Sequence, residues 1–191
     1  MLGIFLDTET NGLNSLKHRV IDIAIKVLDL QNGNIVAEYQ SLVRQPKEIW
    51  ENSDPVSLSV NGYNYETISH GKVESLVSSE IVEFFESHNL KRKKAVFICQ
   101  NPSFDRPFFS QLVIPEIQEK LSWPYHWLDL ASMHWAVCMK KGKPYPWEIG
   151  LSKDAIARFL SLPEEAKPHR AKNGVEHLIL CYEKIIGFPS S

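Results

Sequence analysis

Residues 2–13 read Leu2-Gly-Ile-Phe-Leu-Asp-Thr-Glu-Thr-Asn-Gly-Leu13, a short apolar run that leads into two acids. Such a run is typical of a buried β-strand. Alternate side chains of a strand share a face, so Asp7 and Glu9 present their carboxylates side by side. Paired carboxylates repel each other, and hard divalent cations such as Mg²⁺ or Mn²⁺ relieve that repulsion. On spacing alone, two solvated acids at a strand end are the simpler interpretation.

The rest of the chain predicts further strands and helices around this first strand. Residues 20–27 and 35–43 favour β-structure, and Asn32-Gly33 between them is typical of a hairpin turn. Later segments alternate short apolar runs with amphipathic spacing, which predicts an α/β domain with a mixed sheet. The expected strands are residues 2–7, 20–27, 35–43, 95–99 and 127–129, and the expected helices are 73–88, 130–136, 152–160 and 175–186.

Length and composition indicate one globular domain. The 191 residues, with 43% hydrophobic and 23% charged, fit a single folded unit at 1–188 with a short tail at 189–191. No apolar run approaches the ~18 residues that a membrane helix needs, so no membrane association is expected. The three cysteines are odd in number and widely spaced, which is typical of free thiols in the cytoplasm.

The charge balance narrows the class of partner. With 21 basic and 23 acidic residues, the formal net charge is −2. A domain that coats duplex nucleic acid by charge alone is usually strongly basic, so that class is disfavoured. A local site that binds phosphates through metal ions is compatible with this net charge, because the ions supply the positive charge.

Flanking residues give the acid pair a specific resemblance. Residues 5–13 resemble the first motif of the DEDDh 3′→5′ exonucleases, D-x-E-T-T-G-L, with Asn11 in place of the second Thr. This family includes ribonuclease T, exonuclease X, oligoribonuclease and the proofreading subunit of bacterial DNA polymerase III. Further matches follow in family order: residues 20–24 to I-x-E-I-A, 101–108 to N-x-x-F-D-x-x-F, 128–129 to the start of D-T-x-x-L-A, and 169–171 to the start of H-x-A-x-x-D.

The resemblance implies a fold, a reaction and a set of catalytic residues. The fold of this exonuclease domain is a ribonuclease H-like mixed sheet, a three-strand meander followed by βα units, with helices on both faces. The reaction is hydrolysis at the 3′ end of single-stranded DNA or RNA by two Mg²⁺ or Mn²⁺ ions. In that scheme Asp7 bridges both ions, and Glu9 holds the ion that carries the attacking water. Asp105 supports the second ion, and His169 is the general base.

The same resemblance suggests substrate contacts around the first two motifs. Leu13 corresponds to a residue that wedges against terminal bases, although a core leucine fits its sequence context equally well. The Asn61-Gly62 pair corresponds to a segment near the 3′ nucleotide, although a plain turn also explains it. Phe104 either stacks on a base or only packs within the protein. The expected substrate-binding residues are Thr10, Gly12, Leu13, Asn61, Asn101 and Phe104.

One position departs from the family pattern. The third motif requires an Asp five residues after the histidine, and Gly174 stands there. Glycine offers no ligand, so one of the two ions is expected to be weakened. Three explanations remain open: a binding protein descended from nucleases, a slow enzyme, or a substitution in an otherwise active enzyme. Restoring Asp at this position is expected to raise nucleotide release at least about tenfold.

These features define one leading function and its alternatives. The leading function is an exonuclease that acts on the 3′ ends of single-stranded nucleic acid, with reduced activity if one metal site is impaired. One alternative is a catalytically inactive nucleic-acid-binding relative. Another is a polymerase-associated subunit, which is less favoured because the sequence has no additional tail beyond Ser191. A homodimer is suggested by analogy with relatives only, and the sequence does not distinguish DNA from RNA substrates.

Overall fold

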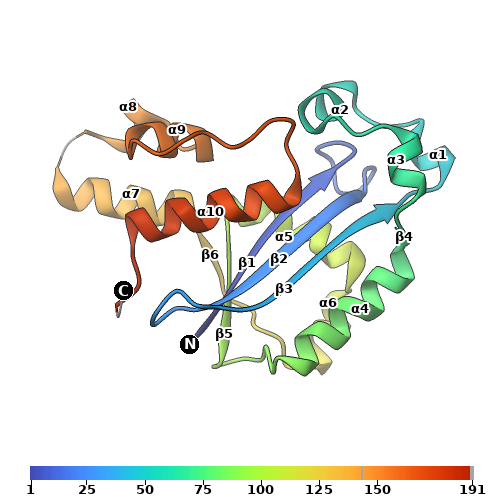
Figure 1. The fold of residues 1–191 in the computed structure, drawn as a ribbon, viewed down its shortest axis with the longest axis horizontal. Helices are drawn as coiled ribbons and strands as arrows, with labels where there is room; N and C mark the ends of the chain where they lie inside the picture. Colours follow the sequence, from blue (N-terminus) through green and yellow to red (C-terminus); the bar gives the residue numbers. More distant parts are fainter. Residues whose placement is uncertain (143, 190–191) are drawn as a thin grey trace.

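A six-stranded mixed sheet forms the centre of the computed structural model, which describes residues 1–142 and 144–189 (Figure 1). Residues 190 and 191 of the expected tail lie outside the described residues. The order across the sheet is β4-β3-β2-β1-β5-β6. The strands are β1 (Leu2–Thr10), β2 (Val20–Asp29), β3 (Ile35–Arg44), β4 (Lys72–Val73), β5 (Ala95–Cys99) and β6 (Trp127–Asp129).

Helices cover both faces of this sheet. Figure 1 shows α10 crossing one face in front of β1 and β2, while α4 and α5 pack on the other face. The expected meander, βα units and two helical layers are therefore confirmed. The helices are α1 (Lys47–Trp50), α2 (Pro55–Asn61), α3 (Tyr65–Ser69), α4 (Glu74–Ser87), α5 (Pro102–Leu112), α6 (Pro115–Lys120), α7 (Leu130–Lys141), α8 (Pro146–Ile149), α9 (Lys153–Phe159) and α10 (Ala171–Ile185).

The pleat of β1 divides the interior into two apolar layers. Ile4 and Leu6 are fully buried in the layer that α4 and α5 cover, whereas Phe5 is buried against α10. This alternation carries on past the apolar run, because β1 extends to Thr10 rather than ending at the first acid. The side chains of Asp7 and Glu9 therefore lie on the α10 side of the sheet.

Strand direction brings distant segments to the same edge of the sheet. β1 and β5 are parallel, so their carboxyl ends lie together. Asn101 lies two residues after β5 and immediately before α5. Its left-handed backbone (φ 58°) turns the chain into the helix, and its N–H donates to Asp129 Oδ1 at 3.0 Å. The second motif therefore starts beside the end of β1.

Across the described residues, the helices are too short or too polar to cross a membrane.

Candidate active site

A cavity of about 260 Å³ opens where β1 ends. All four predicted catalytic residues line it, and they come from β1, α5 and the loop before α10. Three further charged residues that the sequence interpretation missed line it as well: Lys153, Asp154 and Glu165. The full lining is Asp7, Thr8, Glu9, Gln100, Phe104, Asp105, Ser152, Lys153, Asp154, Glu165 and His169.

Asp105 is fixed on the α5 side of the cavity. It is only 4% exposed, and Thr8 Oγ1 donates a hydrogen bond of 2.8 Å to its Oδ1. Burial, followed by the neighbouring Asp7 carboxylate, raises the pKa of Asp105 well above its usual range. The structure thus brings Asp105 together with Asp7, as the motif order predicts, in surroundings where a carboxylate without a cation is costly.

The acids of β1 are perturbed in the same direction. Burial raises the pKa of Asp7, and Lys153 opposes that shift through a contact of 3.2 Å between its Nζ and Asp7 Oδ1. Burial, then the charges of Asp7 and Glu165, raise the pKa of Glu9 to about 9. Each of these carboxylates is therefore stabilised by a bound proton or a nearby cation more than a solvent-exposed acid would be.

Gly174 lies directly against Asp7. A Cβ atom at position 174 would be 2.2 Å from Asp7 Oδ2, closer than any real contact allows. The glycine is therefore at the place the third motif predicts, beside the first acid. Its lack of a side chain creates the space in which the Asp7 carboxylate sits.

Lys153 joins three parts of the cavity wall. Its Nζ donates to Gly174 O at 3.1 Å and to Asp7, and it pairs with Glu165 Oε2 at 2.8 Å. Burial disfavours the ammonium, but Asp7 and Glu165 together raise the pKa of Lys153 above its ordinary value. No local pattern marks either Lys153 or Glu165, because each meets its partners only after α9 and α10 have packed.

His169 reaches the cavity from the loop before α10. Its side chain is 27% exposed, and its Nδ1 lies 3.4 Å from Glu165 Oε1. The backbone holds it in place, since the His169 N–H donates to Val60 O at 3.2 Å. Ligand atoms of Glu9, Glu165 and His169 all lie within 4.8 Å of one another. The predicted general base is thus beside the acids and is open to water.

A second cavity of about 230 Å³ adjoins the first and contains most of the predicted substrate contacts. Thr10, Leu13, Asn61 and Phe104 line it together with Thr8 and Glu9. Leu13 is 72% exposed, so the core-leucine interpretation of this residue is wrong. Asn61 is buried and its Nδ2 donates to Thr10 O at 3.0 Å, which fixes the backbone at the end of β1.

Two predicted contacts lie outside the linings described for these cavities. The ring of His18 occupies the space beside Gly12, where a Cβ would meet it at 2.4 Å. Gly12 therefore allows its loop segment to lie close to the segment that carries His18. Asn101 is exposed, and it contributes the turn that begins α5.

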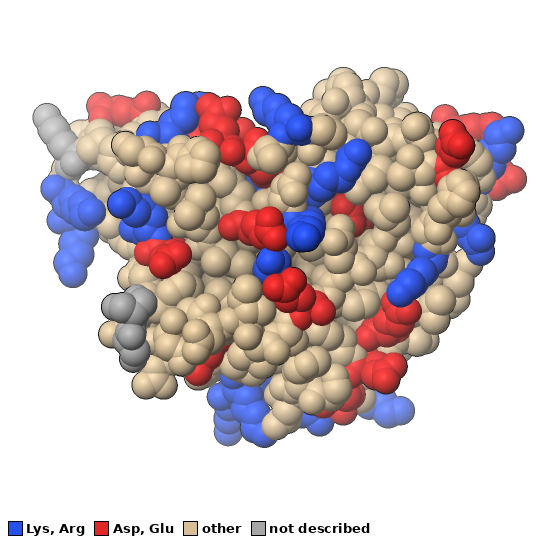
Figure 2. All heavy atoms as spheres, viewed as in Figure 1, with Lys and Arg blue, Asp and Glu red and all other residues tan. Residues whose placement is uncertain are grey.

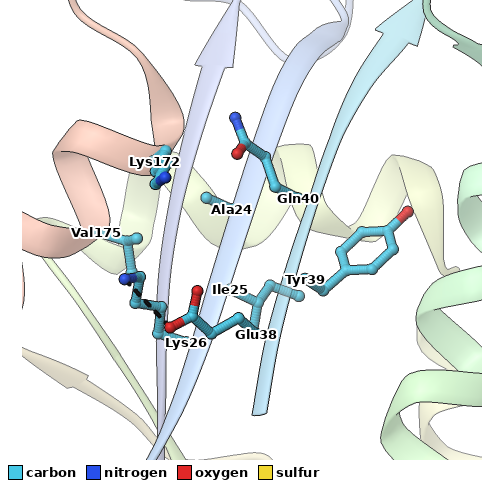
Figure 3. Close-up of a pocket in the computed structure, with 8 residues that line it drawn as sticks. All are labelled: Ala24, Ile25, Lys26, Glu38, Tyr39, Gln40, Lys172 and Val175. Atoms are coloured by element: carbon cyan, nitrogen blue, oxygen red, sulfur yellow. Dashed lines mark ion pairs between the residues drawn. The ribbon is translucent and has the colours of Figure 1, made fainter. Parts of the chain in front are cut away.

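A separate hollow in the described part of the chain contains a different set of residues. A hollow of about 120 Å³ lies between β2, β3 and α10. Lys26 and Glu38 form an ion pair in its lining (Figure 3), with 3.4 Å between Nζ and Oε1. None of the predicted site residues lines it. Figure 2 shows acidic and basic side chains interspersed over the viewed face. The acid cavity at the end of β1 is thus the better candidate for chemistry.

Known proteins share this fold. E. coli exonuclease I in complex with a 5cy-dT13 oligonucleotide has a TM-score of 0.76 at 14% identity, covering 97% of this chain and 40% of that one. The chain has the fold of the DEDDh exonucleases. The nuclease domain of 3′hExo, a DEDDh family member bound to rAMP, has a TM-score of 0.72 at 13% identity, covering 98% and 94%. Cell-death related nuclease 4 has a TM-score of 0.75 at 15% identity, covering 97% and 63%. The ribonuclease H-like fold expected from the motifs is confirmed.

One curated sequence relative agrees with the structural neighbours. The DNA polymerase III PolC-type protein of Thermotoga petrophila is 26% identical over 157 residues, which are 82% of this chain. The chain spans 10% of the length of that relative and about two fifths of exonuclease I. No family model matches the chain.

Proposed function

We propose that residues 1–188 form a metal-dependent 3′→5′ exonuclease that acts on the 3′ ends of single-stranded DNA or RNA. The observation that carries this proposal is the gathering of Asp7, Glu9, Asp105 and His169 into one cavity from three distant segments. Neighbours with the same fold are bound to a dT13 oligonucleotide or to rAMP, which supports either polymer as the substrate.

The donor set fits two Mg²⁺ or Mn²⁺ ions. Carboxylate oxygens and one imidazole converge on the cavity, and the raised pKa values of the acids indicate that positive charge is needed there. Asp7 and Glu9 would hold one ion, and Asp7 and Asp105 the other. Bound in pairs, such ions activate a water molecule and neutralise the charge that develops on the phosphate oxygens.

The remaining steps belong to the protein's side chains. His169 would accept the proton of the attacking water, because its imidazole lies beside the acids and is open to solvent. Leu13 and Phe104 receive the terminal nucleotide in the adjoining cavity, and Thr10 and Asn61 hold the shape of that cavity. Gly174 itself supplies no ligand, so one ion would be held more weakly, and the reaction would be slower, than with the full set of family acids.

The PolC-type relative supports a second candidate function. Its 157 matched residues are one segment of a polymerase, so this chain is a candidate proofreading exonuclease that works beside a polymerase. Both functions use the same site. We place them in the cytoplasm, because the described cysteines Cys99, Cys138 and Cys181 are all buried free thiols.

The proposed reaction is tested with oligonucleotides labelled at either end. Single-stranded DNA and RNA labelled at the 5′ end should shorten into a ladder with Mn²⁺ or Mg²⁺, and labels at the 3′ end should be released first. EDTA should abolish both effects, and Asp105→Asn should slow them about 100-fold or more. If the protein binds oligonucleotides but never shortens them with either metal, it is a binding relative and the proposal is wrong.

A further inference from the structure

Glu165 lies in the candidate active site although no family motif includes it. We propose that its carboxylate is a cation ligand beside Glu9, and that it takes over from another side of the cavity the role that the family gives to the Asp missing at Gly174. This inference rests on the proposed function and names one of its metal ligands.

The two oxygens of Glu165 have different surroundings. Oε2 pairs with Lys153 Nζ at 2.8 Å, whereas Oε1 is buried and has no hydrogen-bond partner among the described residues. The side chain is only 2% exposed. A buried carboxylate oxygen that accepts no hydrogen bond is costly, and a bound ion is one way in which proteins offset that cost.

The Glu165 carboxylate is close to the other donors, and its Oε1 lies 3.4 Å from His169 Nδ1. Ligand atoms of Glu165, Glu9 and His169 all lie within 4.8 Å of one another. Oxygen ligands lie about 2.1 Å from Mg²⁺, so ligands on opposite sides of an ion are about 4.2 Å apart. A shift of less than about one ångström would bring these donors to that spacing.

The backbone also holds Glu165 at the site. Its N–H donates to Asp154 Oδ1 at 3.1 Å, which ties the loop to the first turn of α9. Lys153 then links the Glu165 carboxylate to Gly174 O on α10. The carboxylate thus reaches the cavity from the α9 side, while the space beside Gly174 is filled by Asp7.

An alternative role for Glu165 does not involve binding the cation. Its Oε1 lies 3.4 Å from His169 Nδ1, so the carboxylate could serve only to orient the imidazole. That role predicts a slower reaction with unchanged metal affinity. Metal binding measured without any nucleic acid therefore separates the two roles.

The test is calorimetric titration of Mn²⁺ into the whole chain and its variants. Glu165→Gln should weaken Mn²⁺ binding at least about tenfold, because a neutral amide replaces a charged ligand. The amide oxygen of the substituted side chain can still accept a hydrogen bond from Lys153, so the local structure should be kept. Thermal unfolding in EDTA shows that each variant is folded.

The matched control is Glu164→Gln. This neighbour is 42% exposed and pairs with Arg158, away from the cavity lining. Its substitution removes the same charge from the adjacent position in the chain. Mn²⁺ binding by the control should stay within about twofold of the wild type.

Each outcome decides the proposal. Weaker Mn²⁺ binding by Glu165→Gln and not by Glu164→Gln supports it. Equal binding by the wild type and Glu165→Gln, with a slower reaction, overturns it and leaves the exonuclease proposal standing. If the wild type binds no Mn²⁺ and cleaves nothing, the proposed function and this inference fail together.

Discussion

At Gly174, the absence of a side chain decides where Asp7 lies. The Asp7 carboxylate fills the space that any larger residue on this turn of α10 would need. The sequence shows only that a ligand is missing. The structure adds that the Asp7 carboxylate fills the space left by the missing side chain. It also shows that Lys153 Nζ donates a hydrogen bond to Gly174 O.

We predict that Gly174→Ala impairs the site although it adds only a methyl group. The new Cβ would lie 2.2 Å from Asp7 Oδ2, so the carboxylate must turn away from its present position. A displacement of this size in a catalytic group costs about 100-fold in rate. Single-turnover cleavage of a labelled oligonucleotide measures it, with the exposed Lys172→Ala as control. Unchanged cleavage by Gly174→Ala would show that Asp7 has other usable positions.

The same contact changes the expectation for Gly174→Asp. From the sequence alone, this restoration should raise activity at least about tenfold. In the structure, its Cβ meets Asp7 and its charge adds to an already acidic cavity. We therefore expect a lower melting temperature in EDTA, with no gain in activity unless Asp7 reorients. A tenfold gain without loss of stability would favour the expectation from the sequence.

Leu13 offers a separate test of substrate contact. It is 72% exposed and lines the cavity beside Glu9, whereas Leu16 is 88% exposed and does not line it. We predict that Leu13→Ala raises KM for oligonucleotides about tenfold, because apolar contact with the terminal nucleotide is lost. Leu16→Ala should leave KM within about twofold. Steady-state kinetics decides, and equal KM values for the two variants would remove Leu13 from the binding site.

Among the helices and strands, the start of α10 depends on Asp22 of β2. Asp22 is fully buried, and its Oδ2 accepts hydrogen bonds from Tyr63 OH at 2.8 Å and from the Ala171 N–H at 3.0 Å. The Ala171 N–H is among those at a helix start that have no partner within the helix. The contact therefore fixes α10, and with it the loop that carries His169.

We predict that Asp22→Ala lowers the free energy of unfolding by about 3 kcal/mol, because two buried donors lose their acceptor. Asp22→Asn retains an acceptor at the same place and should cost less than about 1 kcal/mol. Urea unfolding of both variants and the wild type measures these differences. Equal losses for Ala and Asn would show that the negative charge matters more than the hydrogen bonds.

Across the molecule as a unit, the acid cavity couples folding to protons and cations. The pKa of Glu9 is raised from 4.5 in the unfolded chain to about 9 in the folded protein, chiefly by burial. The folded state therefore binds the Glu9 proton more tightly, so its stability falls as pH rises between these values. Cations that replace the proton should offset this loss.

We predict that the melting temperature in EDTA decreases between about pH 6 and about pH 9, and that Mn²⁺ reduces the decrease. Glu9→Gln, which carries no titrating proton, should show a smaller decrease than the wild type. Thermal unfolding followed by circular dichroism across this range measures both effects. A wild-type melting temperature that rises with pH in EDTA would contradict the assignment of the raised pKa.

Local patterns in the chain were enough to predict the sheet and the place of the acid pair. Strand periodicity placed Asp7 and Glu9 on one face, because side chains of a strand alternate with a period of two residues. The resemblance to the exonuclease motifs implied that Asp105 and His169 lie near them, and the structure brings all four residues into one cavity. The parallel pairing of β1 with β5 explains how α5 comes to start beside the end of β1.

The surroundings of those acids emerged only from the packed fold. Lys153 and Glu165 carry no local signal, since their contacts with Asp7 and His169 form only when α9, the following loop and α10 pack together. The exposure of Leu13 was equally unpredictable, because an apolar residue after a strand fits a core or a surface. Burial and charge pairing arise between segments distant in the chain, so no reading of neighbouring residues could supply them.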